Sequence, residues 1–408
     1  MTAFDIAFTR AQFPAFSDPD LEGWAFFENA GGSYPAQATI DRLHRFYART
    51  KVQPYGAYPV SQKAGAAMDE GYARIAALLG VGEDEVHFGP STTQNAYVLA
   101  QAFRELWTPG DEIVVTNQDH EANSGPWRRL EAFGIVVREW RVDPETGALD
   151  LADLDKLLSE RTRLVAFPHA SNIVADINPV AEIAAKVHAA GALVCVDGVS
   201  YCGHGLPDVG ALGADIYLFS AYKTWGPHQG VMVVRRALAD RLPNQSHWFN
   251  AGYIRKKLVP AGPDHAQVAA MAGVADYLDA LHARHFADEV APVERGRRVH
   301  DLIRAREIAL TQPLMDYLRG RNDIRVLGPT DPVRRAPTVA MVCDRPGAEM
   351  AKALAAHKVM CGGGHFYARR LIEGMGVDEA HGALRVSFLH YTAEAEIEQL
   401  IAGLDAVL

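Results

Sequence analysis

The sequence of 408 residues contains only four cysteines, and no two of them stand in CxxC spacing. They are Cys195, Cys202, Cys343 and Cys361. This number is too small for a disulfide framework, and the spacing does not suit a structural zinc site. We therefore expect no metal site, and we expect the protein to work in a reducing compartment, most simply the cytoplasm.

Long apolar runs and a surplus of positive charge are also missing. No stretch approaches the roughly 18 apolar residues that span a bilayer. The N-terminal "MTAFDIAFTRAQFPAFSD" contains acids and lacks the apolar core of a signal peptide. The formal net charge of −10 argues against nucleic acid or an anionic membrane surface as the main partner.

The middle of the chain alternates short apolar runs with longer amphipathic stretches. Runs such as "DEIVVTN", "TRLVAFPHAS" and "ALVCVDGVS" are separated by stretches such as "PVAEIAAKVHAAG". The runs are continuously apolar, which predicts an α/β domain whose mostly parallel sheet is buried on both faces by helices. Ligands of such sheets bind at the carboxyl ends of the strands.

The pattern changes after about residue 265. A long helical stretch, "HAQVAAMAGVADYLDALHARH", leads into "PTVAMVCD", "GALRVSFLHY" and a final amphipathic "AEIEQLIAGLDAVL". We predict a large ligand-binding domain over residues 26–265, followed by a linking helix and a small α+β domain over residues 266–408. Residues 1–25 are too short for a domain and are expected to pack with the small one.

Polar side chains follow several of the predicted strands. Asp197 ends "LVCVDG", Asn172 follows "LVAFPHAS", and His120 follows "IVVTNQD". Each has an ordinary structural explanation, because Asp197 alone suits a cap or turn and a lone histidine is more often a core residue. A carboxylate after a buried strand is nevertheless costly unless it is paired.

Hydroxyl groups and a lysine complete the same edge. Ser91, Thr92 and Thr93 precede a helical run, where they suit either a helix cap or a bound phosphate. Lys223 stands in "FSAYKTWGPHQG", where the chain leaves a strand, with Ser220 three residues earlier. A lysine, an acid, a flat ring and a phosphate cradle are the groups that pyridoxal 5'-phosphate (PLP) requires. Their order along the chain strengthens this prediction.

With these residues in place, the sequence resembles the class V aminotransferase family of PLP-dependent enzymes (fold type I), and within it the cysteine-desulfurase-like branch. The similarity extends from "FFENAGGSYPA" through "HEANSGPW", "VDGVSYCGHG" and "SAYKTWGPHQG" to "LRVSFLHYT". It implies a sheet of the seven-stranded type in the large domain. It also implies a homodimer whose sites lie at the subunit interface.

The resemblance assigns roles to individual residues. Lys223 matches the lysine that forms the Schiff base, Asp197 the acid that pairs with the pyridine nitrogen, and His120 the ring that stacks on the cofactor. Further cofactor contacts are implied for Thr92, Thr93, Asn172, Ser200, Ser220 and Tyr222.

Substrate contacts are implied as well. Arg385 in "LRVSF" matches the arginine that takes the substrate carboxylate, for which its bidentate fork is suited. Asn29, Ala30 and Asn172 are expected near the substrate. His365 and Tyr367, in "GGGHFYARR", are candidate acid–base groups of a mobile lid, and a purely structural role is the alternative.

The sequence departs from the desulfurases at several positions. Ser200 stands in place of a glutamine, Tyr222 in place of a histidine, and Pro263 in place of a threonine that reaches the neighbouring subunit's phosphate. Tyr367 stands where desulfurases carry a nucleophilic cysteine, and a phenol is a poor sulfur acceptor. Cys361 lies six residues upstream and is more simply explained as a small buried residue.

These observations favour a PLP-dependent enzyme that acts on a small α-amino acid. Chemistry like that of a cysteine desulfurase or a C–S lyase, without the usual loop cysteine, is the first hypothesis. Transamination and epimerisation are the alternatives within the family, because they share the early steps. A PLP-binding scaffold without catalysis is a remote alternative, because the set of site residues is intact.

Overall fold

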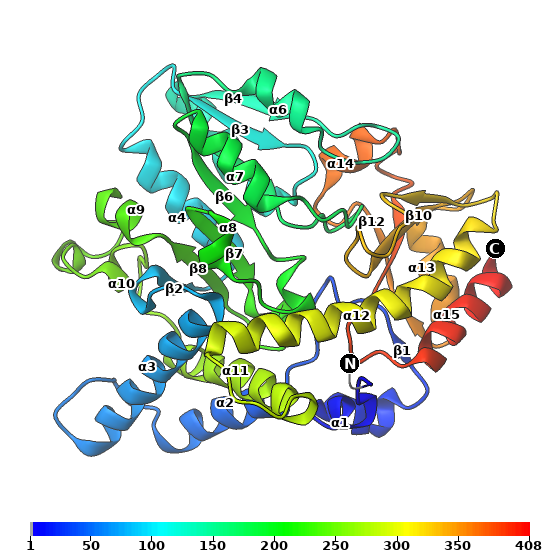
Figure 1. Cartoon of the computed structure of the whole chain (residues 1–408), viewed down its shortest axis with the longest axis horizontal. Helices are drawn as coiled ribbons and strands as arrows, with labels where there is room; N and C mark the ends of the chain where they lie inside the picture. Colours follow the sequence, from blue (N-terminus) through cyan, green and yellow to red (C-terminus); the bar gives the residue numbers. More distant parts are fainter. Residues whose placement is uncertain (1–2) are drawn as a thin grey trace.

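A seven-stranded sheet forms the centre of the computed structural model, which describes residues 3–408 (Figure 1). The strand order is β2-β8-β7-β6-β5-β3-β4. The strands are β2 (Val86–Gly89), β3 (Glu112–Thr116), β4 (Val136–Trp140), β5 (Thr162–Pro168), β6 (Leu193–Asp197), β7 (Ile216–Ser220) and β8 (Gly230–Val234). From β4 to β7 all neighbouring strands are parallel, and only β8 runs against its neighbours.

Both faces of this sheet are buried, as its continuously apolar strands predict. Successive residues of one strand enter two different hydrophobic clusters. In β6, Val194 and Val196 belong to the first cluster, whereas Cys195 between them belongs to the second. This is the two-residue period of a strand covered by apolar side chains on both sides.

Helices on the two faces supply these clusters. The first face is covered by α3 (Pro59–Leu79), α7 (Val180–Ala189) and α11 (His265–His285), and the second by α4 (Thr92–Arg104) and α5 (Glu121–Arg128). Helix α11 packs against both α3 and α2 (Gln37–Arg49). The backbones approach closely there, because a Cβ atom at Gly71 would lie 2.2 Å from the Val268 carbonyl oxygen.

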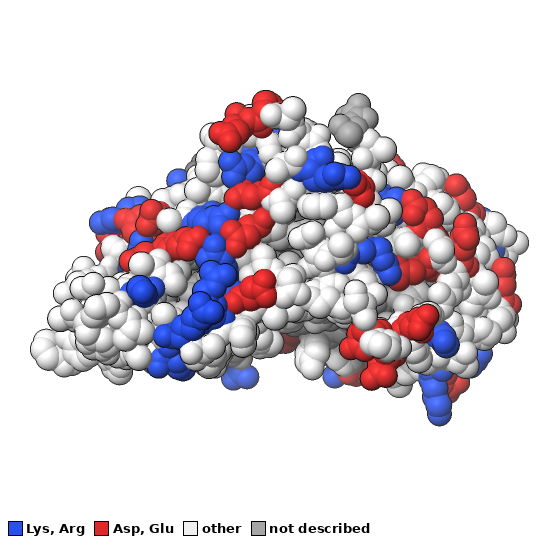
Figure 2. All heavy atoms as spheres, turned by 90° about the horizontal axis from the view of Figure 1, so that it is seen from below, with Lys and Arg blue, Asp and Glu red and all other residues white. Residues whose placement is uncertain are grey.

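Ion pairs join the same helices on the side of the molecule seen in Figure 2, where acidic and basic side chains intermingle. Arg42 of α2 pairs with Glu70 of α3 at 2.8 Å and also with Asp276 of α11. Arg74 of α3 pairs with Asp276 and with Asp279. The charges are only partly exposed and share partners, so they act as a network rather than as isolated surface pairs.

A second, four-stranded sheet lies toward the C-terminal side of the molecule (Figure 1). Its order is β12-β13-β10-β9, and its strands are β9 (Arg325–Leu327), β10 (Thr338–Val342), β12 (Gly362–Gly364) and β13 (Ala383–Ser387). It packs against α12 (Pro292–Arg319), α13 (Gly347–Ala355) and α15 (Glu394–Val407). The short strands β1 (Ala25–Phe26) and β11 (Val359–Met360) pair beside it.

The remaining helices are short, and the N-terminal one touches the C-terminal part of the chain. They are α1 (Ile6–Arg10), α6 (Leu151–Leu157), α8 (Val209–Leu212), α9 (Arg236–Arg241), α10 (Ile254–Lys257) and α14 (Arg369–Gly374). Arg10 of α1 donates to the Tyr391 carbonyl at 3.0 Å and pairs with Glu396 at 2.8 Å. The predicted domain bounds at residues 25 and 265 remain a prediction.

No helix within residues 3–408 has the length and apolar character needed to cross a membrane. The same residues contain no cluster of three or more His, Cys, Asp or Glu side chains that could hold a metal ion.

Candidate active site

The carboxyl ends of the parallel strands meet at one cavity, and all of the predicted cofactor-binding residues line it. The lining residues are Ser91, Thr92, Thr93, His120, Ala122, Pro168, Ala170, Asn172, Asp197, Val199, Ser200, Ser220, Tyr222 and Lys223. They come from the start of α4, the segments after β3 and β5, the end of β6 and the turn after β7. The parallel order of the sheet therefore brings together residues that are far apart in the sequence.

Lys223 lies in a 3₁₀ turn directly after β7. It keeps a small exposed fraction at the cavity, yet protein atoms surround its ammonium group. This desolvation, together with the positive charge of Arg385, lowers the pKa of Lys223 to about 8, against the opposing effects of the Asp197 and Glu28 carboxylates. A substantial fraction of the amine is therefore neutral near physiological pH, which is the nucleophilic form.

Asp197 ends β6 and faces the same cavity. Its Oδ1 accepts a hydrogen bond from the Val199 amide at 2.8 Å, and within residues 3–408 it forms no ion pair. Burial raises the pKa of Asp197 to about 6, against the opposing effects of this hydrogen bond and of Lys223. A buried carboxylate that lacks a cationic partner is suited to a ligand that brings one, such as a protonated ring nitrogen.

The opposite part of the cavity carries hydroxyl groups at a helix N-terminus. The Thr92 Oγ1 and Ser220 Oγ atoms lie 2.8 Å apart and are buried. Helix α4 begins at Thr92, and the Ser91 hydroxyl caps it by accepting from the Gln94 amide at 3.2 Å. Free backbone N–H groups, the helix dipole and two hydroxyls together fit a phosphate group.

His120 is the N-cap residue of α5. Its Nδ1 accepts from the Ala122 amide at 3.0 Å, so a neutral ring carries its proton on Nε2. Burial lowers the pKa of His120 to about 3, and the charges of Lys223 and Arg385 add to this effect. The ring is therefore neutral, which suits stacking on another aromatic ring.

A buried acid beside His120 was missed in the sequence. Asp119 accepts from the Thr116 hydroxyl at 2.6 Å and from the Asn123 side chain at 2.8 Å. Burial raises the pKa of Asp119 to about 8, so it is mostly protonated at neutral pH. Its partners are only three and four residues away in the sequence, but its position after β3 was the only sign of a site residue, because burial of the carboxyl group cannot be read from the sequence.

Arg385 lies on β13 and does not line the cavity. Its Nη2 pairs with the Glu28 Oε1 atom at 2.8 Å, and its Nη1 donates to the Asn172 carbonyl at 3.2 Å. The Phe366 ring covers the guanidinium group, with Cζ 3.8 Å from the ring centroid. Glu28 and Phe366 are thus further residues of the site that the sequence motifs did not reveal.

The other residues predicted near the substrate are bound to protein neighbours. Asn29 donates to the Ser387 carbonyl at 3.1 Å and accepts from the Tyr391 hydroxyl, while the Ala30 amide donates to the Ser387 hydroxyl at 2.8 Å. These contacts fix the segment after β1 against β13 but do not bring Asn29 or Ala30 to the cavity lining.

The segment that follows the glycines of β12 folds over His120. The Tyr367 ring centroid lies 5.4 Å from that of His120, and the Tyr367 carbonyl accepts from the Glu121 amide at 2.8 Å. Phe366 and Tyr367 both have positive φ, at 48° and 59°, a conformation that costs energy in residues other than glycine. Tyr367 is 70% exposed.

Other predicted residues of this region lie apart from the cavity. His365 Nε2 is 3.8 Å from Glu379. Cys361 is largely enclosed, and this burial together with the nearby Glu28 carboxylate raises the pKa of its thiol to about 12. Pro263 lies in the segment between Leu258 and Asp264, which lines a separate neighbouring pocket.

Comparisons with known proteins agree with this geometry. The sequence profile of the family "Aminotransferase class-V" matches residues 25–400. The chain belongs to this family. It is 33% identical to the aminotransferase-like protein FGM3 of Gibberella zeae, over 100% of this chain and 99% of that protein. It is 29% identical to a cysteine desulfurase of Dickeya dadantii, over 98% and 95% of the two chains.

The fold is similar to that of a cysteine desulfurase of known structure. The crystal structure of the cysteine desulfurase CsdA of Escherichia coli superposes with a TM-score of 0.83 and 23% identity, over 100% of this chain and 99% of that one. The predicted fold class, PLP-dependent fold type I, is confirmed.

Family membership makes this chain a PLP-dependent enzyme, as the sequence predicted. The cavity fits that cofactor by its own chemistry. A buried carboxylate without an ion pair, a helix N-terminus with two hydroxyls and a partly neutral lysine line one space. The residues that would hold PLP in this cavity include Lys223, Asp197, Thr92 and Ser220.

The environment of Lys223 predicts an unusual titration. Competitive labelling of the cofactor-free protein with acetic anhydride, followed by peptide mass spectrometry, measures how much of the amine is neutral. We expect the labelling of Lys223 to rise with pH around a midpoint near pH 8, instead of near its ordinary pKa of 10.5.

Two variants test the cause of this shift. Arg385→Gln removes a charge that lowers the pKa and should move the midpoint up, whereas Asp197→Asn removes one that raises it and should move the midpoint down. A midpoint close to 10.5 in the unchanged protein would contradict the desolvation of Lys223.

Proposed function

We propose that Lys223 is the amine that holds PLP and that the enzyme acts on the amino group of a small α-amino acid or a close derivative of one. The observation that supports this most is the meeting of Lys223, Asp197 and the Thr92–Ser220 hydroxyl pair at one cavity. The order of these groups along the chain is the one expected for the family, and each faces the cavity with the chemistry its role requires.

Each residue of the cavity would have a distinct task. PLP, when bound, supplies a reactive carbonyl group and a ring that accepts electrons from the substrate. Asp197 would keep the ring nitrogen protonated, because a cation beside this carboxylate restores its ionised form. The neutral His120 ring would pack on one face, and Thr92, Thr93 and Ser220 would bind the phosphate. Asn172, Ser200 and Tyr222 would complete the cofactor contacts.

Lys223 would also serve as the base. With a pKa near 8, Nζ can take the proton from the substrate Cα and return it, because a neutral amine is available at physiological pH. A lysine with its ordinary pKa would be protonated almost completely and would serve poorly in this role.

The thiols bear on which reaction follows. Cys361 is protonated at neutral pH, and Tyr367 occupies the position of the nucleophilic cysteine of desulfurases. Buried Cys195 and Cys202 also have raised pKa values because of desolvation. We therefore favour C–S cleavage that needs no protein thiolate over transfer of sulfur to a cysteine.

Transamination and epimerisation remain the alternatives, because the similarity to FGM3 spans the whole chain and that protein is described as aminotransferase-like. Loss of catalysis with retention of PLP binding is the remote alternative. We place the reaction in the cytoplasm, on the ground that all four cysteines are unpaired.

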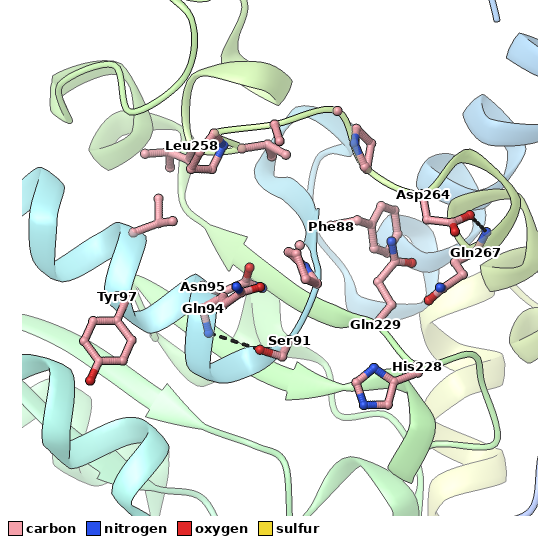
Figure 3. A pocket seen from close by; sticks show the side chains of 18 residues that line it. Phe88, Ser91, Gln94, Asn95, Tyr97, His228, Gln229, Leu258, Asp264 and Gln267 are labelled. Atoms are coloured by element: carbon pink, nitrogen blue, oxygen red, sulfur yellow. Dashed lines mark hydrogen bonds between the residues drawn. The ribbon is translucent and has the colours of Figure 1, made fainter. Parts of the chain in front are cut away.

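We further propose that two chains associate beside the cofactor cavity. A pocket of about 720 Å³ opens next to it and shares the residue Ser91 (Figure 3). The start of α4 and residues 258–264 face each other across this space, and most of its lining is apolar. Exposed aromatic side chains lie in the neighbouring segments, including Tyr97 and Phe249. An apolar hollow with exposed aromatic residues is typical of a protein interface.

Screening of amino acids for release of sulfide, pyruvate or another keto acid would identify the reaction. We expect Lys223→Ala to lower the rate by roughly 10³-fold or more.

Cys361→Ser should retain most of the activity, because a protonated thiol is not the nucleophile. Sulfide release that disappears in Cys361→Ser would contradict this choice and indicate transfer of sulfur to the thiol.

Light scattering would test the association of two chains. We expect a mass of twice 44.5 kDa. Tyr97→Asp should weaken the dimer, because a charge would enter an apolar interface. The matched control is Val333→Asp, which is 62% exposed in the C-terminal part of the chain and should leave the dimer intact. A monomer at micromolar concentration in the unchanged protein would refute the proposal.

A further inference from the structure

Arg385 already has a carboxylate partner inside the protein. The Glu28 Oε1 atom lies 2.8 Å from its Nη2, and the Arg385 side chain is only 4% exposed. The backbone passes close to the carboxylate of this pair. A Cβ atom at Gly362 would lie 2.7 Å from Glu28 Oε2, and one at Gly31 would lie 3.0 Å from Oε1. Two glycines therefore leave the space that this carboxylate fills.

The charge of Arg385 is thus compensated before any substrate arrives. A free substrate carboxylate would gain one cation but would also meet the negative charge of Glu28 on the same guanidinium group. The Glu28 side chain is 31% exposed, but its Oε2 atom is buried, so water screens this repulsion less than it would on the surface. A ligand group that carries no net charge avoids it.

The unsatisfied hydrogen-bonding atoms around the pair specify that group further. Glu28 Oε2 and Asn172 Oδ1 are buried acceptors without a donor, and Arg385 Nε is a buried donor without an acceptor. Buried polar atoms of this kind are costly unless a ligand pairs with them. A carboxylate or an ester offers only acceptors and would leave both oxygens unpaired, whereas an amide offers a carbonyl oxygen together with N–H donors.

Phe366 makes two contacts that fix the side chains of Asn172 and Arg385 in place. The Asn172 Nδ2 atom donates to the Phe366 carbonyl at 2.9 Å, which turns Oδ1 away from that bond. The Phe366 ring lies over the guanidinium group at 3.8 Å. Asn172 lines the cofactor cavity, and its carbonyl accepts from Arg385 Nη1 at 3.2 Å, so the Glu28–Arg385 pair lies directly behind a residue of the cavity wall. The charges of both residues also influence the Lys223 amine.

We propose that Glu28 determines the substrate class of this site: an amino acid whose carboxyl group is in amide linkage, either an amino acid amide or the N-terminal residue of a peptide. The amide carbonyl accepts from Arg385 Nε, and the amide N–H donates to Glu28 Oε2. This inference rests on the proposed function, since the same substrate's amino group must react at Lys223.

The test compares L-alanine, L-alaninamide and L-alanine methyl ester as ligands of the holoenzyme. Changes in visible absorbance and in melting temperature give an apparent Kd for each probe, independent of turnover. We expect the amide to bind at least about tenfold more tightly than the free acid, because one hydrogen bond to a charged group changes the affinity by about that factor. The ester, which is neutral but lacks N–H groups, should bind between the two.

Glu28→Gln tests the assigned residue directly, because it keeps the shape of the side chain and frees the charge of Arg385. We expect the preference to reverse in favour of the free acid. Glu379→Gln is the matched control: it removes a carboxylate that pairs with Arg369 near the same segment, and it should leave the preference unchanged.

The outcomes separate this inference from the proposed function. Tighter binding of the free acid, equal binding of amide and ester, or an unchanged preference in Glu28→Gln would each overturn the role of Glu28 while leaving the role of Lys223 intact. If no amino acid, amide or ester of the amino acids that we screen alters the absorbance of the holoenzyme, the proposed function itself fails, and the inference fails with it.

Discussion

The desolvation of Lys223 is the constraint on which the rest of the site depends. An ammonium group at the buried end of β7 loses hydration, and its pKa falls to about 8. The Asp197 carboxylate nearby loses hydration too, and its pKa rises to about 6. The attraction between the two charges does not cancel either pKa shift. The amine is therefore suited to an electrophile of a ligand, and the carboxylate to a cationic group of the same ligand. The fold tolerates this cost because large apolar clusters on both faces of the sheet stabilise it.

The sequence predicted the fold class and the cofactor cavity because both follow from local patterns. Continuously apolar strands predict a parallel sheet, and polar residues directly after such strands must meet at one edge. Lys223, Asp197 and His120 could therefore be placed without knowledge of any contact. The partners of Arg385 could not be placed in this way, because Glu28 is 357 residues away from it in the sequence. The two residues meet only because the segment after β1 pairs with β13. The position of Phe366 could not be predicted either, because it depends on a left-handed backbone conformation at this residue.

The residues that line the cofactor cavity and those that we propose to influence the reaction lie in different parts of the chain. The cavity residues come from rigid strand ends, whereas Tyr367 and Cys361 belong to the segment after and around β12. That segment carries the exposed phenol of Tyr367 and the Cys361 thiol, whose pKa burial raises to about 12. Family membership fixes the cofactor, whereas the specific reaction depends on side chains around the substrate, such as those of this segment and the Glu28–Arg385 pair.

The central claim is that Lys223 carries the cofactor, and reduction of the purified holoenzyme with borohydride tests it most directly. Borohydride makes the bond between the cofactor and its lysine permanent, so that the modified peptide can be identified by mass spectrometry. We predict a single phosphopyridoxyl group on the peptide that contains Lys223. A modification on another lysine, or a holoenzyme from which all PLP is released after reduction, would contradict the claim.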